Sequence, residues 1–157
     1  LVFTMEEVWL ERFPGDESSV HLVDFDETPS DWRNDVLAAK WAVVRSVRRV
    51  VTGALEVERT AKVIGASLEA APTVYVNVET AKLLETVAFD DLSITSGIYV
   101  STDAAPADAF TLDDVAGVAV VFAKAEGEKC QRCWKILPDV GTHSHEGVCA
   151  RCNEALK

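Results

Sequence analysis

The chain has 157 residues, of which 48% are hydrophobic, and its formal net charge is −11. This length and hydrophobic content allow one ordinary domain or two small ones, and they exclude an intrinsically disordered chain. No apolar run approaches the roughly 18 residues of a membrane span, so we expect no membrane partner. The overall acidity disfavours a nucleic-acid partner unless basic side chains are concentrated locally.

Two helices are predicted in the first half of the chain. The first covers residues 1–12, with Thr4 as its N-cap, and a Phe-Pro-Gly sequence ends it. The sequence Thr-Pro-Ser-Asp at residues 28–31 can cap a second helix. Beyond it, apolar residues recur at intervals of three, four and seven, which predicts an amphipathic helix to about Lys62, with Gly65 as a stop.

The second half of the chain changes to the period of two that is typical of strands. Residues 73–78, 93–100 and 115–123 are predicted strands, because they are rich in β-branched and aromatic side chains. Residues 79–87 have the spacing of a short amphipathic helix. Residues 103–108, rich in Ala, Asp and Pro, are expected to form a loop.

Basic side chains are concentrated in one segment of this acidic chain. Residues 1–31 hold nine acidic side chains and one basic one, whereas residues 32–71 carry a net charge of +3. The predicted long helix carries a basic row of Arg45, Arg48, Arg49, Arg59 and Lys62. The row is either a solvated face paired with glutamates of the same helix or a salt-sensitive contact to a sugar-phosphate backbone.

Four cysteines near the C-terminus have the spacing C-x2-C-x15-C-x2-C, and the chain has no other cysteine. Each C-x-x-C turn, called a knuckle below, aims two thiolates at one point, so two knuckles complete a tetrahedral zinc site. Such a closed site has no position for substrate, and it predicts a structural metal. The alternative is a pair of redox motifs. Thiols paired for metal fit a reducing cytosol. The predicted ligands are Cys130, Cys133, Cys149 and Cys152.

Charged and aromatic side chains surround the predicted zinc site. Lys129, Arg132, Lys135 and Arg151 either compensate the charge of about −2 on a zinc tetrathiolate or contact phosphate. Trp134 is predicted to be a lid over the small core of the ribbon; the alternative is a platform for an unstacked RNA base.

No catalytic constellation is evident in the sequence. It lacks a Gly-rich phosphate loop, a nucleophile elbow and a His-Glu-x-x-His helix. The carboxylate pairs Asp90-Asp91 and Asp113-Asp114 lie in turn-like surroundings, where we expect them to be solvated. His143 and His145, between the knuckles, are predicted to be surface residues.

Several motifs resemble, in order, the C-terminal region of bacterial-type isoleucyl-tRNA synthetases. They are the opening Phe3–Trp9, the Phe-Pro-Gly loop, the stretch from Glu58 to Ala70, and residues 125–134 with the second knuckle. The resemblance implies an α+β piece of a larger enzyme. Its parts would be the end of a helical anticodon-binding bundle (residues 1–71), a small α/β junction module (72–124) and a zinc ribbon (125–157).

The resemblance also implies a function for the parent and a set of partners. The parent would be a cytoplasmic ligase that attaches isoleucine to its tRNA with ATP, and this part would bind neither ATP nor the amino acid. Its partners would be the anticodon arm of isoleucine tRNA and the remaining domains of the parent chain. The candidate tRNA-contacting residues are Arg45, Arg49, Arg132 and Arg151.

Two other interpretations of the sequence stay open. The first is a purely structural ribbon that packs on the other domains without touching RNA. The second is the four-cysteine finger of the formamidopyrimidine-DNA glycosylase family. That family uses an N-terminal proline, where this chain has Leu1, and an arginine on the finger hairpin, where this chain has His143-Ser144-His145.

Overall fold

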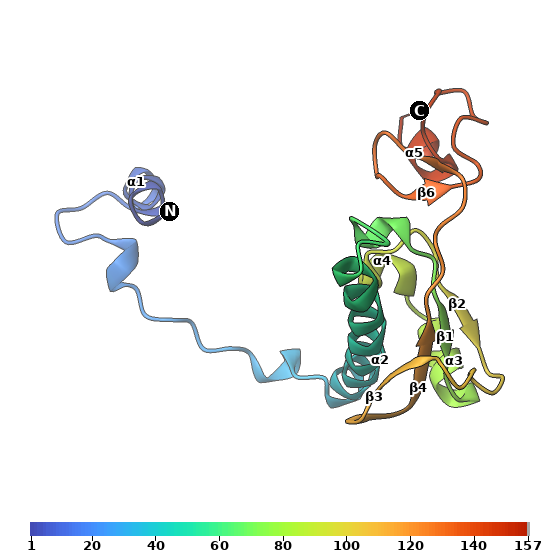
Figure 1. Cartoon of the computed structure of the whole chain (residues 1–157). Helices are drawn as coiled ribbons and strands as arrows, with labels where there is room; N and C mark the ends of the chain where they lie inside the picture. The colour runs from blue at the N-terminus through green and yellow to red at the C-terminus, as the bar shows by residue number, and fades with distance from the viewer. Residues whose placement is uncertain (157) are drawn as a thin grey trace. The chain divides into compact units, whose positions relative to one another are not determined.

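The computed structural model describes residues 1–156, which form two units, residues 1–35 and the chain from residue 36 onward. The predicted α+β class is confirmed, because both helices and sheets are present (Figure 1). None of the helices in the described residues is long and apolar enough to cross a membrane.

The first unit contains helix α1 (Val2–Arg12) and two short 3-10 turns, Val20–Leu22 and Ser30–Trp32. The predicted helix over residues 1–12 is confirmed, but its N-cap is Leu1 rather than Thr4. The segment after the helix folds back on it, because the carboxylate of Glu6 accepts hydrogen bonds from the Ser19 hydroxyl and the Val20 backbone, both at 3.0 Å. No residue of α1 is buried.

The long helix α2 spans Asp35–Thr60, so it begins later than predicted. The predicted capping segment instead forms the 3-10 turn at Ser30–Trp32, and Arg33 after it is extended. The helix ends with Lys62 in the left-handed region (φ 60°), and the amide of Val63 donates to the carbonyl of Glu58. This is a Schellman termination, so the stop comes before Gly65.

The second unit contains a four-stranded sheet in the order β2-β1-β4-β3. Strand β1 (Thr73–Tyr75) pairs in parallel with β2 (Tyr99–Ser101) and antiparallel with β4 (Val115–Val121), and β4 also pairs antiparallel with β3 (Phe110–Leu112). Parallel pairing of β1 and β2 requires a crossover, which helices α3 (Val78–Leu84) and α4 (Phe89–Ser93) supply.

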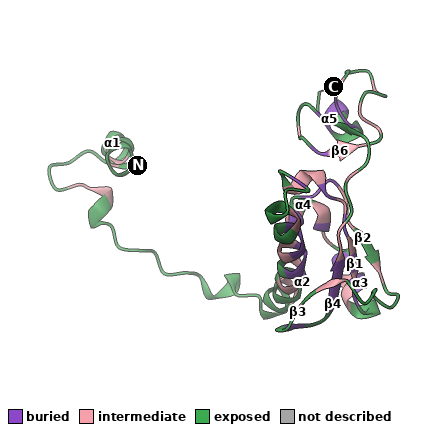
Figure 2. Ribbon diagram, viewed as in Figure 1, coloured by how far each residue is buried: buried purple, intermediate pink, exposed green. Residues whose placement is uncertain are grey.

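Helix α2 packs on this sheet and shares one hydrophobic core with it (Figure 2). Val47, Val50 and Val51 on the helix belong to the same cluster as Val74 on β1 and Val120 on β4, and all five are at most 1% exposed. The period of 3.6 residues places the apolar side chains of α2 on one face of the helix, and the period of two places those of β1 and β4 on one face of the sheet. The predicted boundary between residues 71 and 72 stays a prediction.

The strand predictions are confirmed at β4 and, over a shorter range, at β1. The prediction over residues 93–100 is wrong for residues 93–98, because α4 (Phe89–Ser93) ends at Ser93 and strand β2 begins only at Tyr99. Ile94 ends that helix in the left-handed conformation, and the amide of Thr95 returns to the carbonyl of Asp90. Strand β3 was not predicted.

The predicted ribbon from residue 125, called the ribbon below, contains β5 (Glu128–Lys129), β6 (Ile136–Leu137) and helix α5 (Ala150–Glu154). Its core is separate from the first one and consists of Val148 and three of the four cysteines, with Cys133, Leu137 and Val140 packed against them. A core this small predicts that the fold of the ribbon depends on a metal.

Candidate metal centre

The two knuckles are built from local backbone hydrogen bonds. Cys130 follows β5, and its carbonyl accepts from the amide of Trp134 at 2.9 Å, while its own amide donates to the carbonyl of Lys135 at 2.8 Å. In the second knuckle, Cys149 is the N-cap of α5, which carries Cys152. Each knuckle therefore holds its two thiols through the turn or helix that contains them.

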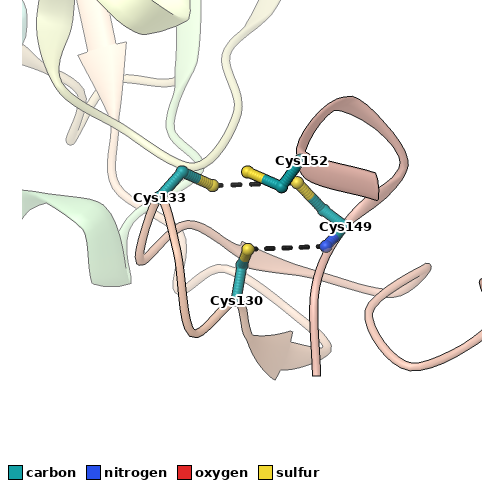
Figure 3. Close-up of side chains that lie close together, drawn as sticks. All are labelled: Cys130, Cys133, Cys149 and Cys152. Carbon is teal, nitrogen blue, oxygen red and sulfur yellow. Dashed lines mark hydrogen bonds between the residues drawn. The ribbon is translucent and has the colours of Figure 1, made fainter. Parts of the chain in front are cut away.

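The four sulfur atoms converge on one point, as Figure 3 shows. All four lie within 4.8 Å of one another, and the Sγ atoms of Cys133 and Cys149 are 3.7 Å apart. A tetrahedral site with Zn–S bonds of about 2.3 Å has S–S edges of about 3.8 Å. A disulfide requires about 2.05 Å, and the four cysteines are free. The donor set and its spacing fit a zinc ion.

The environment of the thiols explains why they need a cation. Burial raises the pKa of Cys130, but the backbone N–H groups of Cys133 and Cys149 lower it, with a net result of about 6. Burial and the neighbouring cysteines raise the pKa of Cys149 to about 12, and burial also raises the pKa of Cys133. Without a metal the four thiols therefore do not ionise together. A bound zinc would supply the positive charge that keeps all four as thiolates.

The four cysteine sulfurs are enclosed by the ribbon. Cys130 and Cys152 are 0% exposed and Cys149 is 1% exposed. The amide of Cys149 also donates to the sulfur of Cys130 at 3.4 Å, a contact of the kind that orients metal ligands. Four protein ligands leave no position for a reacting water.

Two of the four candidate tRNA-contacting arginines lie in the ribbon. The guanidinium of Arg132 donates to the sulfur of Cys152 at 3.6 Å, and Arg151 lies between the ligands of the second knuckle and pairs with Asp91 at 3.0 Å. These contacts agree with charge compensation around a zinc tetrathiolate. The role of both arginines toward RNA stays a prediction.

The other two candidate arginines lie on exposed positions of α2. Arg49 pairs with Asp114, beside the turn between β3 and β4, at 2.6 Å. The side chain of Arg45 makes no hydrogen bond or ion pair within residues 1–156. Two other basic side chains of α2 have partners within the protein. Arg48 donates a hydrogen bond to the carbonyl of Leu92, and Arg59 forms an ion pair with Glu56, both at 2.6 Å.

Trp134 is not the predicted lid. Its side chain is 60% exposed, and its backbone is in the left-handed region with φ of 67°. The ammonium of Lys129 lies 5.5 Å from the centre of its ring. An exposed indole beside a cation is a surface on which a planar ligand can stack.

The predicted surface histidines have local partners. His143 contacts the carboxylate of Asp139 at 3.0 Å, and the Nδ1 atom of His145 lies 2.9 Å from the side-chain oxygen of Asn153. Asp139 also accepts from the backbone of Ala150, at the start of α5, at 2.7 Å. The histidines therefore order the loop between the knuckles and lie outside the thiol cluster.

Sequence reasoning missed the contact between the ribbon and α4. Asp90 and Asp91, expected to be solvated, both pair with Lys135 of the ribbon, at 2.5 and 2.6 Å. The hydroxyl of Ser96 accepts from the amide of Ile136 at 2.6 Å. The only sequence signal was the adjacent pair of carboxylates, which did not indicate a partner 45 residues away.

The fold and the site define a zinc-finger domain at the C-terminal end of an α+β chain: residues 127–154 match the family model described as the zinc finger found in FPG and IleRS. The relatives of the whole chain narrow this class. The chain is 66% identical to the isoleucine–tRNA ligase of Ruegeria pomeroyi. The matched region covers 99% of this chain and 16% of that ligase. The chain is 58% identical to the isoleucine–tRNA ligase of Brucella abortus, over 90% of this chain and 14% of that ligase. It is 50% identical to the isoleucine–tRNA ligase of Agrobacterium fabrum, over 100% of this chain and 16% of that ligase.

The predicted resemblance to isoleucyl-tRNA synthetases is therefore confirmed. The finger model alone is shared by two kinds of protein, but the matches to the ligases extend along the whole chain, well beyond the finger. The chain spans about a sixth of the length of these relatives.

Proposed function

We propose that this chain is the C-terminal tRNA-binding region of an isoleucine–tRNA ligase, with a structural zinc and no catalytic site of its own. The observation that carries the proposal is the 66% identity to such a ligase over nearly the entire chain. The complete enzyme would attach isoleucine to its tRNA with ATP bound in another part of the protein. It would act in the cytoplasm, without a membrane partner.

The exposed Trp134 supports a direct contact between the ribbon and RNA. Trp134 is 60% exposed, so its indole ring is available to a partner. Unpaired bases of RNA loops stack on aromatic side chains, and the nearby Lys129 adds a positive charge for the backbone. An anticodon loop offers such bases.

The four candidate arginines differ in whether an aspartate of the protein already pairs with them. Arg45 is exposed and makes no ion pair within the described residues, so its charge is available to a phosphate. Arg49 and Arg151 are each paired with an aspartate, so a phosphate would have to compete with a carboxylate. Arg132 is exposed and also contacts a thiolate ligand. We infer that Arg45 and Arg132 contribute more to RNA affinity than the other two.

A purely structural ribbon is the second candidate. It is favoured by the pairing of Lys135 and Arg151 with α4, since these cations contact protein rather than a ligand. The remaining domains of the parent would then be the only partners of the ribbon. The exposed Trp134 is available to either partner, RNA or those domains, and RNA binding separates the two candidates.

Binding to RNA tests the proposal. The zinc-loaded chain should bind isoleucine tRNA more tightly than an unrelated tRNA at two salt concentrations. Trp134→Ala should weaken binding about tenfold, since stacking contributes ~1–3 kcal/mol per base. Tyr99→Ala, which removes an aromatic side chain that is 68% exposed on β2, is the control. Equal, weak binding of both tRNAs by the wild-type chain would contradict anticodon-arm recognition.

The salt dependence identifies the phosphate contacts. Arg45→Ala should reduce the log–log slope of affinity against salt by about one, the contribution of one neutralised phosphate. Lys82→Ala, which removes an exposed cation on α3, should leave the slope unchanged. An unchanged slope in the Arg45 variant would remove Arg45 from the interface, and the same criterion applies to Arg49.

A further inference from the structure

Helix α4 presents two adjacent carboxylates to cations from both knuckles of the ribbon. Lys135, two residues after Cys133, pairs with Asp90 at 2.5 Å and with Asp91 at 2.6 Å. Arg151, in the second knuckle, pairs with Asp91 at 3.0 Å. Asp90 and Asp91, which lie outside the ribbon, therefore form ion pairs with a cation next to the first knuckle and a cation within the second.

Lys135 is the central member of this contact. Its side chain is 11% exposed, which is unusual for lysine, because an ammonium group loses its hydration when it is buried. A buried charge that keeps its partners resists displacement, because moving either partner leaves the other unpaired.

A neutral contact lies beside the charged one. Ser96 is 4% exposed; its hydroxyl accepts from the amide of Ile136 at 2.6 Å and donates to the carbonyl of Leu68. The carbonyl of Lys135 accepts from the amide of Cys130, so the chain that reaches α4 and Ser96 is also tied to the first metal ligand. The charged and neutral contacts together specify the position of the ribbon against the sheet.

We propose that Asp90 and Asp91 are positioning residues: they fix the orientation of the ribbon on α4 and so determine where Trp134 and Lys129 meet RNA. The inference rests on the proposed tRNA-binding function. It assigns the acidic pair a role opposite to that expected from its charge. Carboxylates beside a basic surface repel phosphate, so electrostatics alone predicts that their removal strengthens RNA binding. Positioning predicts that their removal weakens binding to the specific tRNA.

The first test measures the orientation of the ribbon without RNA. The variant Asp90→Asn with Asp91→Asn keeps the shape of both side chains and removes their charge. In the complete chain loaded with zinc, we expect hydrogen exchange at the Ile136 amide to accelerate at least tenfold, with one zinc still bound. Asp113→Asn, which neutralises an exposed aspartate without a partner in residues 1–156, is the control. Unchanged exchange at Ile136 in the double variant would overturn the proposal.

A second variant covers the case in which the double variant does not fold. Lys135→Met removes the buried ammonium and keeps a side chain of similar length, and the two half-exposed carboxylates can then be solvated. Faster exchange at Ile136 is again expected, with zinc retained. Protection equal to the wild type would show that the ion pairs do not hold the ribbon.

The second test connects orientation to RNA. Affinity for isoleucine tRNA should fall at least fivefold in the double aspartate variant, although the variant carries two fewer negative charges. Faster exchange with unchanged or tighter tRNA binding would overturn the positioning role. The tRNA affinity of Trp134→Ala, with both aspartates intact, distinguishes failure of the positioning role from failure of the proposed function. If Trp134→Ala binds isoleucine tRNA as tightly as the wild type, Trp134 does not stack on RNA and that part of the proposed function is contradicted.

Discussion

Gly53 on α2 and the ring of Phe110 on β3 are in direct contact. A Cβ atom placed on Gly53 would lie 2.8 Å from Cε1 of the ring, closer than real carbon atoms approach. Helix propensity alone makes this glycine a weak point of the helix, by about 1 kcal/mol relative to alanine. The structure indicates that the missing side chain is what allows α2 to lie on the edge strand.

We expect Gly53→Ala to destabilise the protein despite its gain in helix propensity. Overpacking costs ~1–3 kcal/mol, and two ring atoms closer than 3.0 Å to the added Cβ place this site above the lower end, where the cost exceeds the gain of about 1 kcal/mol from alanine. Urea unfolding monitored by circular dichroism measures the difference. In a Phe110→Leu background the same substitution should become stabilising, because the ring is gone. A stabilising effect in both backgrounds would show that the ring moves aside without cost.

Metal removal should unfold the ribbon and leave the core of α2 and the sheet folded. The two cores are separate, and that of the ribbon consists mainly of the metal ligands. Chelation, or Cys130→Ser, should therefore abolish protection from hydrogen exchange in residues 126–156 and preserve it in α2. Loss of both parts in one thermal step after chelation would contradict this modular organisation.

Zinc binding to the metal-free chain at pH 7 should release protons. Because we expect the ribbon to unfold without metal, the four cysteines of the metal-free chain should have the ordinary thiol pKa of about 8.5 and be protonated at this pH. Close to four protons should then be released for each zinc ion bound. Calorimetry in buffers of different ionisation enthalpy counts them. Release of only about two or three would show that the metal-free knuckles retain the folded arrangement, in which the pKa of Cys130 is about 6.

The ion pair between Arg49 and Asp114 should produce a pH-dependent difference in stability. The hydrogen bond from Arg49, with its charge, holds the pKa of Asp114 below the usual 3.8. A depressed folded-state pKa stabilises the folded protein above 3.8, and this contribution is lost as the pH falls through the folded-state value. The wild type should therefore melt slightly above Asp114→Asn at pH 5–7.

The melting-temperature difference should disappear at pH values below the folded-state pKa of Asp114. The ribbon loses zinc in both proteins under acid, so the comparison isolates the ion pair. High salt should reduce the difference as well, because both side chains are more than half exposed. A difference that persists in acid would have to come from packing of the asparagine.

Features that depend on neighbours in the chain were predictable from the sequence. The four thiols were identified by spacing, because each C-x-x-C turn brings two ligands together locally. Most of α2 followed from apolar periodicity, the end of α1 from the Phe-Pro-Gly sequence, and β4 from a continuous apolar run. The start of α2 was wrong because a cap and a 3-10 turn use the same residue types at 28–31. Strand β3 is too short for its pattern to be distinguished from a loop.

Only the tertiary structure decided which charged and aromatic side chains are available to a partner. The sequence by itself determined a four-thiol metal site, a basic helix and a resemblance to one enzyme family. Whether Trp134 is covered or exposed, and whether Asp90 and Asp91 meet water or Lys135, depends on contacts between segments about 45 residues apart. Such contacts arise when the ribbon packs against α4, and no local pattern of residues specifies them.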